Sequence, residues 1–145
     1  MTTPANRRER SSGSEMMTKC YITIGSNDLE RSFAFYDPVM QALGGNVTAD
    51  YEGMTRSYGL PDGFQVWVTK PENQQEAACG NGHTAGLYAA DPAAVDAAHS
   101  AALANGGSDE GAPGPRPLYG PEFYGAYARD PEGNKIAFVT YVKVD

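Results

Sequence analysis

Hydrophobic and polar positions along the chain follow the same order twice. Residues 21–45 show an alternating pattern, a few small polar residues, a helical apolar pattern and a glycine pair, and residues 83–107 repeat this order. An aspartate precedes each helical segment, Asp28 in the first and Asp91 in the second. The chain is therefore predicted to contain two copies of one supersecondary unit.

The first copy begins with a predicted strand at residues 20–25. Ile22 and Ile24 alternate with Tyr21 and Thr23. We expect the two isoleucines to face a covering helix and the other two side chains to face the opposite side, because successive side chains of a strand alternate.

A helix is predicted to follow, because Asp28 offers a side-chain oxygen to the free amides of a first turn. Its apolar stripe has helical spacing and consists of Leu29, Phe33, Tyr36, Met40 and Leu43. Pro38 lies inside this segment, so we expect it to kink the helix or to end its regular part. Gly44 and Gly45 then supply a left-handed stop.

Three further strands are predicted from alternation and from turn residues, at residues 46–51, 55–60 and 64–69. In the last of these, alternation puts Trp67 on the face opposite Val66 and Val68. Residues 70–82 are polar and contain glycine, so they are predicted to connect the two copies.

The second copy is predicted to begin with a strand at residues 83–89 and to continue with an alanine-rich helix from Pro92. The apolar stripe of this helix consists of Val95, Ala98, Ala102 and Leu103. His99 is expected at its surface or rim. Residues 108–117 are rich in proline and glycine and are predicted to form a long loop. After an aromatic-rich segment, a strand at residues 135–142 closes the chain.

The predicted order is thus βαβββ twice, which is an α+β fold. Neither copy buries both faces of its own sheet, so we expect the two to pair into a curved mixed sheet whose concave face forms a cleft. Residues 1–17 lack apolar periodicity and are expected to be a disordered tail. Residues 18–145 are expected to form one domain, with modules at about 18–70 and 83–145.

Composition narrows the range of partners. The net charge is -7 and the predicted domain has no cluster of Lys and Arg, so nucleic acid is not expected to bind. No apolar run approaches the length of a membrane helix, so no membrane partner is expected. Cys20 and Cys79 lack metal-ligand spacing, and without a recognisable signal peptide they predict free thiols in a reducing, cytoplasmic location.

Two motifs resemble those of a known family. One is Ile-Gly-Ser-Asn-Asp-Leu-Glu-Arg-Ser at residues 24–32, with Phe-Tyr further along the helix, and the other is Asp-Pro-Glu-Gly-Asn-Lys-Ile at residues 130–136. Together with the repeat, they resemble the vicinal oxygen chelate superfamily of glyoxalase I, bleomycin-resistance proteins, fosfomycin-resistance enzymes and extradiol dioxygenases. The resemblance covers residues 18–142. It implies the fold rather than one reaction, because this scaffold carries many.

In metal-dependent members of that superfamily, four His, Glu or Gln ligands come from the first and last strands of each module. The repeat aligns Tyr21 with His83 and Trp67 with Ala137, so these four are the corresponding positions. Only His83 among them is a good ligand for a divalent metal. The resemblance therefore implies no metal site at these positions, and carboxylates that the alignment does not place are the alternative.

Ligand binding is assigned to the residues expected around the cleft, which are Tyr21, Trp67, His83, Arg116, Tyr119 and Tyr124. Trp67 is expected to stack on flat ligands, and Arg116 to clamp a carboxylate or phosphate. His83 and Tyr21 are the only candidates for catalytic acid–base groups. Each residue also has a structural interpretation, as a hydrogen-bonded histidine, a packed aromatic or a surface arginine.

Three hypotheses follow. The first is a cytoplasmic protein without a cofactor that binds a small, partly aromatic molecule in an apolar cleft, as the bleomycin-resistance proteins do. The second is a metal-dependent glyoxalase-like lyase or dioxygenase-type enzyme that acts on a small oxygenated substrate. The third is an interaction module whose cleft is filled by its own aromatic side chains. The resemblance also implies a homodimer.

Overall fold

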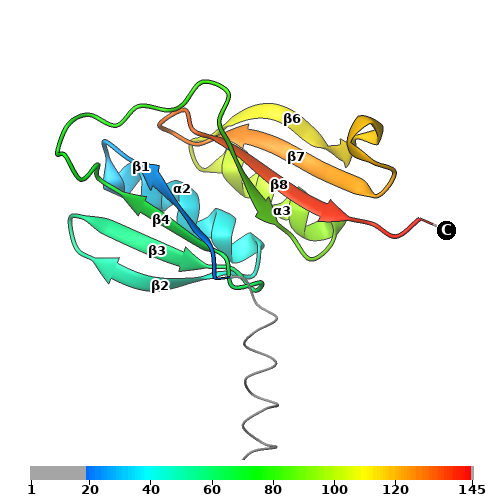
Figure 1. The fold of residues 1–145 in the computed structure, drawn as a ribbon, viewed down its shortest axis with the longest axis horizontal. Helices are drawn as coiled ribbons and strands as arrows, with labels where there is room; N and C mark the ends of the chain where they lie inside the picture. Colours follow the sequence, from blue (N-terminus) through cyan, green and yellow to red (C-terminus); the bar gives the residue numbers. More distant parts are fainter. Residues whose placement is uncertain (1–18, 145) are drawn as a thin grey trace, which may run out of the picture.

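The computed structural model describes residues 19–144, which form two βαβββ modules in tandem (Figure 1). The first module consists of β1 (Tyr21–Gly25), α2 (Leu29–Ala42), β2 (Asn46–Tyr51), β3 (Thr55–Gly59) and β4 (Gln65–Thr69). The second consists of β5 (Thr84–Tyr88), α3 (Pro92–Ala104), β6 (Ser108–Pro115), the 3-10 helix η1 (Pro117–Tyr119), β7 (Phe123–Arg129) and β8 (Lys135–Tyr141). The tail expected at residues 1–17 lies outside the described residues.

Each module has its own four-stranded mixed sheet with the same topology. The strand orders are β1-β4-β3-β2 and β5-β8-β7-β6, and the first strand of each module pairs in parallel with the last. All other pairs are antiparallel. The α+β fold with two modules is thus confirmed, and the eight strands lie in two sheets beside each other (Figure 1).

The core lies between the sheets and their helices. On the first sheet Val66 and Val68 are fully buried under α2, and on the second Leu87 and Phe138 are fully buried under α3. The two helices also pack against each other, so one apolar cluster runs through both modules. Because each helix covers only one face of its sheet, the opposite face of each sheet stays open. Neither described helix is long and apolar enough to cross a membrane.

Helix α2 begins as predicted and ends later than Pro38. The Asp28 carboxylate accepts the Arg31 backbone N–H at 3.1 Å and caps the first turn. The helix then runs through Pro38 to Ala42, so the prediction that Pro38 ends its regular part is wrong. Proline removes one helical hydrogen bond, and burial of the same helix face on both sides of it, at Tyr36 and Val39, offsets that loss.

The prediction of a loop at residues 108–117 is wrong, because most of this segment forms the edge strand β6. Among the described strands it pairs only with β7, and the pairing shifts register around Gly111 and Gly114. An edge strand tolerates proline because its outward amides need no partner. His99 was also misjudged: it is buried, and its Nε2 lies 3.0 Å from Oδ1 of Asp109 on β6.

Candidate functional site: two open sheet faces

The open face of the first sheet borders a hollow of about 930 Å³, which we call the first hollow. Strands β1, β3 and β4 form its floor, and the turn before β3 and the segment after β4 form its walls. Its floor and wall residues include Tyr21, Thr23, Met54, Thr55, Gln65, Trp67, Thr69 and Lys70. This volume lies within the range of about 300–1,000 Å³ typical of small-molecule sites.

Trp67 occupies the middle of this floor. In the strand register it stands between Thr23 of β1 and Ser57 of β3. Tyr21 pairs with Gln65 one step further along the same face, and the Tyr21 side chain is 67% exposed. Within residues 19–144, no side-chain hydrogen bond engages Tyr21, Gln65 or Trp67. Their polar ends are therefore available to a ligand.

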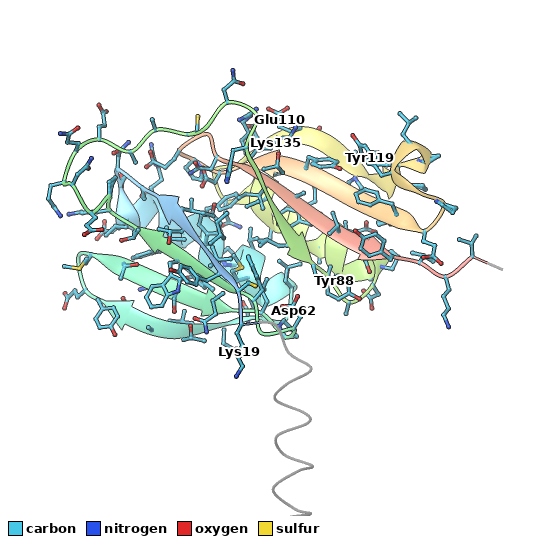
Figure 2. All side chains as sticks on the ribbon, viewed as in Figure 1. Lys19, Asp62, Tyr88, Glu110, Tyr119 and Lys135 are labelled. Atoms are coloured by element: carbon cyan, nitrogen blue, oxygen red, sulfur yellow. The ribbon has the colours of Figure 1, made fainter. Side chains whose placement is uncertain are left out.

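The open face of the second sheet borders a hollow of about 620 Å³, the second hollow. Gly86 and Ala137 lie side by side in its floor, on the paired strands β5 and β8. Tyr119 and Phe123 meet edge to face at 5.3 Å between ring centroids and give the hollow an aromatic wall. Figure 2 shows Tyr119 at one end of this face and Lys135 with Glu110 toward the other.

Two cations stand over the Tyr127 ring in the second hollow. The Arg116 guanidinium carbon lies 5.6 Å from the ring centroid, and the Lys135 ammonium nitrogen lies 5.4 Å from it. Burial, and secondarily the neighbouring Tyr119, raises the pKa of Tyr127, so this phenol stays neutral at physiological pH. The face thus combines neutral aromatic rings with two positive charges.

The predicted ligand-binding residues divide between the two hollows. Tyr21 and Trp67 share the first hollow, and Arg116 and Tyr119 share the second. His83 lines neither. It is exposed, precedes β5, and borders a smaller hollow of about 260 Å³ at the seam between the sheets. His83 and Tyr21, the two candidates for acid–base groups, therefore line different hollows.

The position of His83 follows from the true alignment of the modules. The Ser26 backbone N–H donates to Thr69, and the Ala89 backbone N–H donates to Val139 in the equivalent place. Ser26 thus corresponds to Ala89, which aligns Tyr21 with Thr84 rather than with His83. A one-residue shift turns a strand side chain to the other face of the sheet.

Tyr124 faces away from both hollows, so its assignment to the cleft is wrong. Alternation along β7 turns it toward α3, where its hydroxyl donates to Asp96 at 2.7 Å and its ring packs against the core. This hydrogen bond is the main reason why the pKa of Tyr124 is raised.

The donors on the open faces do not fit the divalent metal that metal-dependent members of the resembled superfamily bind. The first and last strands contribute Tyr21, Gln65 and Trp67 in one module and Lys135 and Ala137 in the other. An ammonium repels a metal ion, and the indole and the methyl group offer it no electron pair. Across residues 19–144 there is also no group of three or more His, Cys, Asp or Glu side chains suited to hold a metal.

Sequence reasoning missed the lysines that line the hollows. Lys19 and Lys70 border the first hollow, and Lys135 borders the second. The signal for Lys135 was present, because it lies two residues before Ala137 and therefore shares its face of β8. Lys19 and Lys70 lie outside the strands, where alternation gives no direction.

Comparison with known proteins places this fold in one family. The model of the Glyoxalase/Bleomycin resistance protein/Dioxygenase superfamily matches residues 20–138. A glyoxalase/bleomycin resistance protein from Albidiferax ferrireducens T118 is 39% identical, with a TM-score of 0.76 over 83% of this chain and 96% of that chain. Lactoylglutathione lyase from Agrobacterium tumefaciens is 22% identical, with a TM-score of 0.59 over 84% and 92% of the two chains, which supports the fold alone. A search of curated proteins found no significant match.

Proposed function

Because the chain belongs to the Glyoxalase/Bleomycin resistance protein/Dioxygenase superfamily, as its motifs indicated, we propose that it binds a small, partly aromatic molecule in the first hollow without a metal ion. The observation that carries this proposal is the position of Trp67, at the centre of an open hollow of about 930 Å³ with Tyr21 beside it. An aromatic ligand placed there would stack on the indole and remove apolar surface from water.

The polar groups of the first hollow suit recognition better than catalysis. The hydroxyls of Thr55 and Thr69 already donate to backbone carbonyls. On the strands of its floor, Gln65 and the hydroxyls of Tyr21 and Thr23 remain as hydrogen-bonding groups, and none of them is a strong base or an activated nucleophile. This set supports a protein that sequesters its ligand, which was the first of our hypotheses.

Elemental analysis tests the metal-free part of the proposal. The full chain, purified without a tag or chelator, is expected to contain well under one Ni, Zn, Mn or Fe per chain. Its melting temperature is expected to stay unchanged when any of these ions is added at low micromolar concentration. Metal near one per chain, with a melt that falls in His83→Ala, would overturn this part and support the metal-dependent enzyme.

Trp67 fluorescence tests the ligand-binding part, because it is the only tryptophan of the chain. A set of small aromatic molecules is titrated into the protein, and at least one is expected to change the indole emission with saturation. Tyr21→Ala should weaken that ligand about tenfold, the equivalent of 1.4 kcal/mol. Tyr51→Ala is the matched control, since Tyr51 is also a strand tyrosine, 59% exposed, and lines neither hollow.

The family also implies a homodimer, and we include this in the proposal. Apolar side chains exposed near the end of the second sheet support it, among them Leu118 at 96% and Tyr141 at 60% exposure. Sedimentation equilibrium of the full chain is expected to give twice the 15.4 kDa mass of one chain. A monomer at tens of micromolar would contradict it.

A further inference from the structure

The positive charges of this acidic protein are unevenly distributed. Eight Lys and Arg residues lie within residues 19–144, and three of them form ion pairs with carboxylates, namely Arg31, Arg56 and Arg129. Of the other five, four line the two hollows: Lys19 and Lys70 the first, Arg116 and Lys135 the second. In a chain of net charge -7, cations without carboxylate partners therefore gather where a ligand would enter.

In the second hollow the arginine is held in place by the protein. Its Nη1 donates to the carbonyls of Gly114 and Pro115 at 3.0 and 3.2 Å, and its Nη2 donates to the carbonyl of Ala112 at 2.7 Å. These carbonyls fix the guanidinium without neutralising it. Its Nε–H is not engaged by any of the described residues, so a fixed positive charge with a spare donor faces the hollow.

Lys135 adds a second cation at the same ring. It forms no ion pair with a described residue, and its ammonium lies over Tyr127, as does the Arg116 guanidinium. The acidic residue of this hollow, Glu110, is bound by Arg129, which offsets its charge. Two positive charges thus remain uncompensated beside one aromatic ring.

The floor of the second hollow leaves room for a flat group. A Cβ atom added at Gly86 would meet no heavy atom within 4 Å, so the space above this glycine is open. Phe123 and Tyr119 border the space with aromatic surface, and Phe123 also contacts Tyr141 edge to face at 5.9 Å. An aromatic ring fits between the glycine floor and this wall, with the cations at one side.

We propose that the second hollow is a binding site for a small aromatic carboxylate. Arg116 and Lys135 bind its carboxylate, and its ring lies over Gly86 against Tyr127 and Phe123. A planar carboxylate accepts two hydrogen bonds from one guanidinium edge, and its oxygens keep further lone pairs for the ammonium. This site is distinct from the first hollow, so the proposal goes beyond the function assigned to Trp67.

The direct test compares 2-naphthoate with 2-naphthamide, which has the same shape and no charge. Both are titrated into the full chain by calorimetry, and amide NMR shifts report which residues respond. We expect naphthoate to bind at least about tenfold more tightly than the amide, with shifts at Gly86 and Gly111, and with weaker binding at high salt. Equal affinities, or shifts confined to β1 and β4, would overturn the proposal. Inorganic phosphate that binds more tightly than naphthoate would also overturn it, in favour of a phosphate site.

Variants locate the binding. Lys135→Gln and Arg116→Gln are each expected to weaken naphthoate about tenfold and to leave the amide unchanged, while Gly86→Phe fills the floor and blocks both. Lys143→Gln is the matched control, because Lys143 forms no ion pair with a described residue and lines neither hollow. Lys135 makes no side-chain hydrogen bond with the described residues, so its variant stays informative if Arg116→Gln fails to fold.

Failure of this site can be told apart from failure of the proposed function. The second hollow contains no tryptophan, so its occupation is read from NMR and heat rather than from Trp67 emission. If Lys70→Gln weakened naphthoate and Lys135→Gln did not, the anion would belong to the first hollow and the present assignment would be overturned.

Discussion

The hydroxyl of Tyr36 donates a 2.6 Å hydrogen bond to Oδ2 of Asp130. Tyr36 lies on α2 of the first module, and Asp130 lies in the turn between β7 and β8 of the second, so this bond joins the two modules inside the core. Both residues are buried. The same carboxylate organises its own turn, because Oδ1 accepts the backbone N–H groups of Glu132 and Asn134.

Tyr36→Phe is expected to destabilise the protein by about 1–3 kcal/mol, because it leaves a buried carboxylate oxygen short of a donor. Urea unfolding followed by circular dichroism measures this free energy. Tyr124→Phe is the matched control: its hydroxyl also donates to an aspartate, Asp96, but in an exposed position. We expect the control to change stability by less than about 0.5 kcal/mol. Equal effects of the two variants would show that the buried bond is not special.

The turn between β7 and β8 also caps the helix of the other module. The Glu132 carboxylate accepts the backbone N–H of Asn27 at 2.8 Å and that of Asp28 at 3.2 Å. It also accepts a hydrogen bond from the Arg31 guanidinium at 2.9 Å. Burial of Glu132 opposes its ionisation, but the Asn27 N–H and the Arg31 guanidinium outweigh this and lower the pKa of the carboxyl. The carboxylate therefore favours the folded state.

This gives the stability a defined pH dependence. The folded pKa of Glu132 lies below its unfolded value of about 4.3, so the stabilisation is complete above that value and is lost as the pH falls through the folded pKa. Glu132→Gln should lower stability at pH 7 by about 1–2 kcal/mol and should flatten the pH dependence below about pH 4.5. Thermal melts from pH 3 to 7 measure this. Glu52→Gln, in an exposed turn, should keep the wild-type slope, and a wild-type slope in Glu132→Gln would refute the assignment.

Gly107, at the end of α3, lies where the two modules approach each other closely. A Cβ atom there would lie 2.7 Å from Cε2 of Phe35 on α2 and 2.8 Å from the backbone oxygen of Arg129. Because the backbone oxygen has no space to move, Gly107→Ala should destabilise the protein by about 1–3 kcal/mol or more. Gly86→Ala is the matched control, since its Cβ meets nothing, and its melting temperature should match that of the wild type. A wild-type melt for Gly107→Ala would contradict this packing.

The sequence predicted most of the fold because the two modules repeat a strongly amphipathic pattern. The capping aspartates, Asp28 and Asp91, both accept a backbone N–H at the expected position. Strand β6 was missed because its proline and glycine residues indicate a loop and outweigh any alternation in its sequence. Pairing with β7 overrides this local preference for a loop. His99 was misplaced for a similar reason, since its partner Asp109 lies on the missed strand.

The candidate site was predictable only where the alternation of side chains along a strand shows which face of the sheet a residue lies on. Tyr21 and Trp67 were placed together because each lies inside a regular strand, on the side away from the core. His83 was placed one residue out of register, since the strand begins after it. The two cations over Tyr127 were not predictable, because the path of Arg116 depends on the carbonyls of β6 that hold it.

The link between His99 and Asp109 should control how firmly β6 is held to the domain. Oδ1 of Asp109 lies 3.0 Å from His99 Nε2 and accepts the Gly111 backbone N–H at 2.9 Å. The Gly111 N–H, and next His99, lowers the pKa of Asp109, so the carboxyl stays ionised to lower pH than an ordinary aspartate. Because β6 is an edge strand with two register shifts, it has a hydrogen-bonded strand on one side only within the described sheet.

Asp109→Ala is therefore expected to speed amide hydrogen exchange across β6 and to leave exchange in β8 at the wild-type rate, since β6 would open without global unfolding. His99→Gln should give a smaller increase, because it removes one of the two contacts of the carboxylate. Exchange measured by NMR at pH 7 checks both variants, with Asp62→Ala, in the turn before β4, as the control. If exchange rose equally in β6 and β8, the pair would stabilise the whole domain, and β6 would not be a separately opening edge.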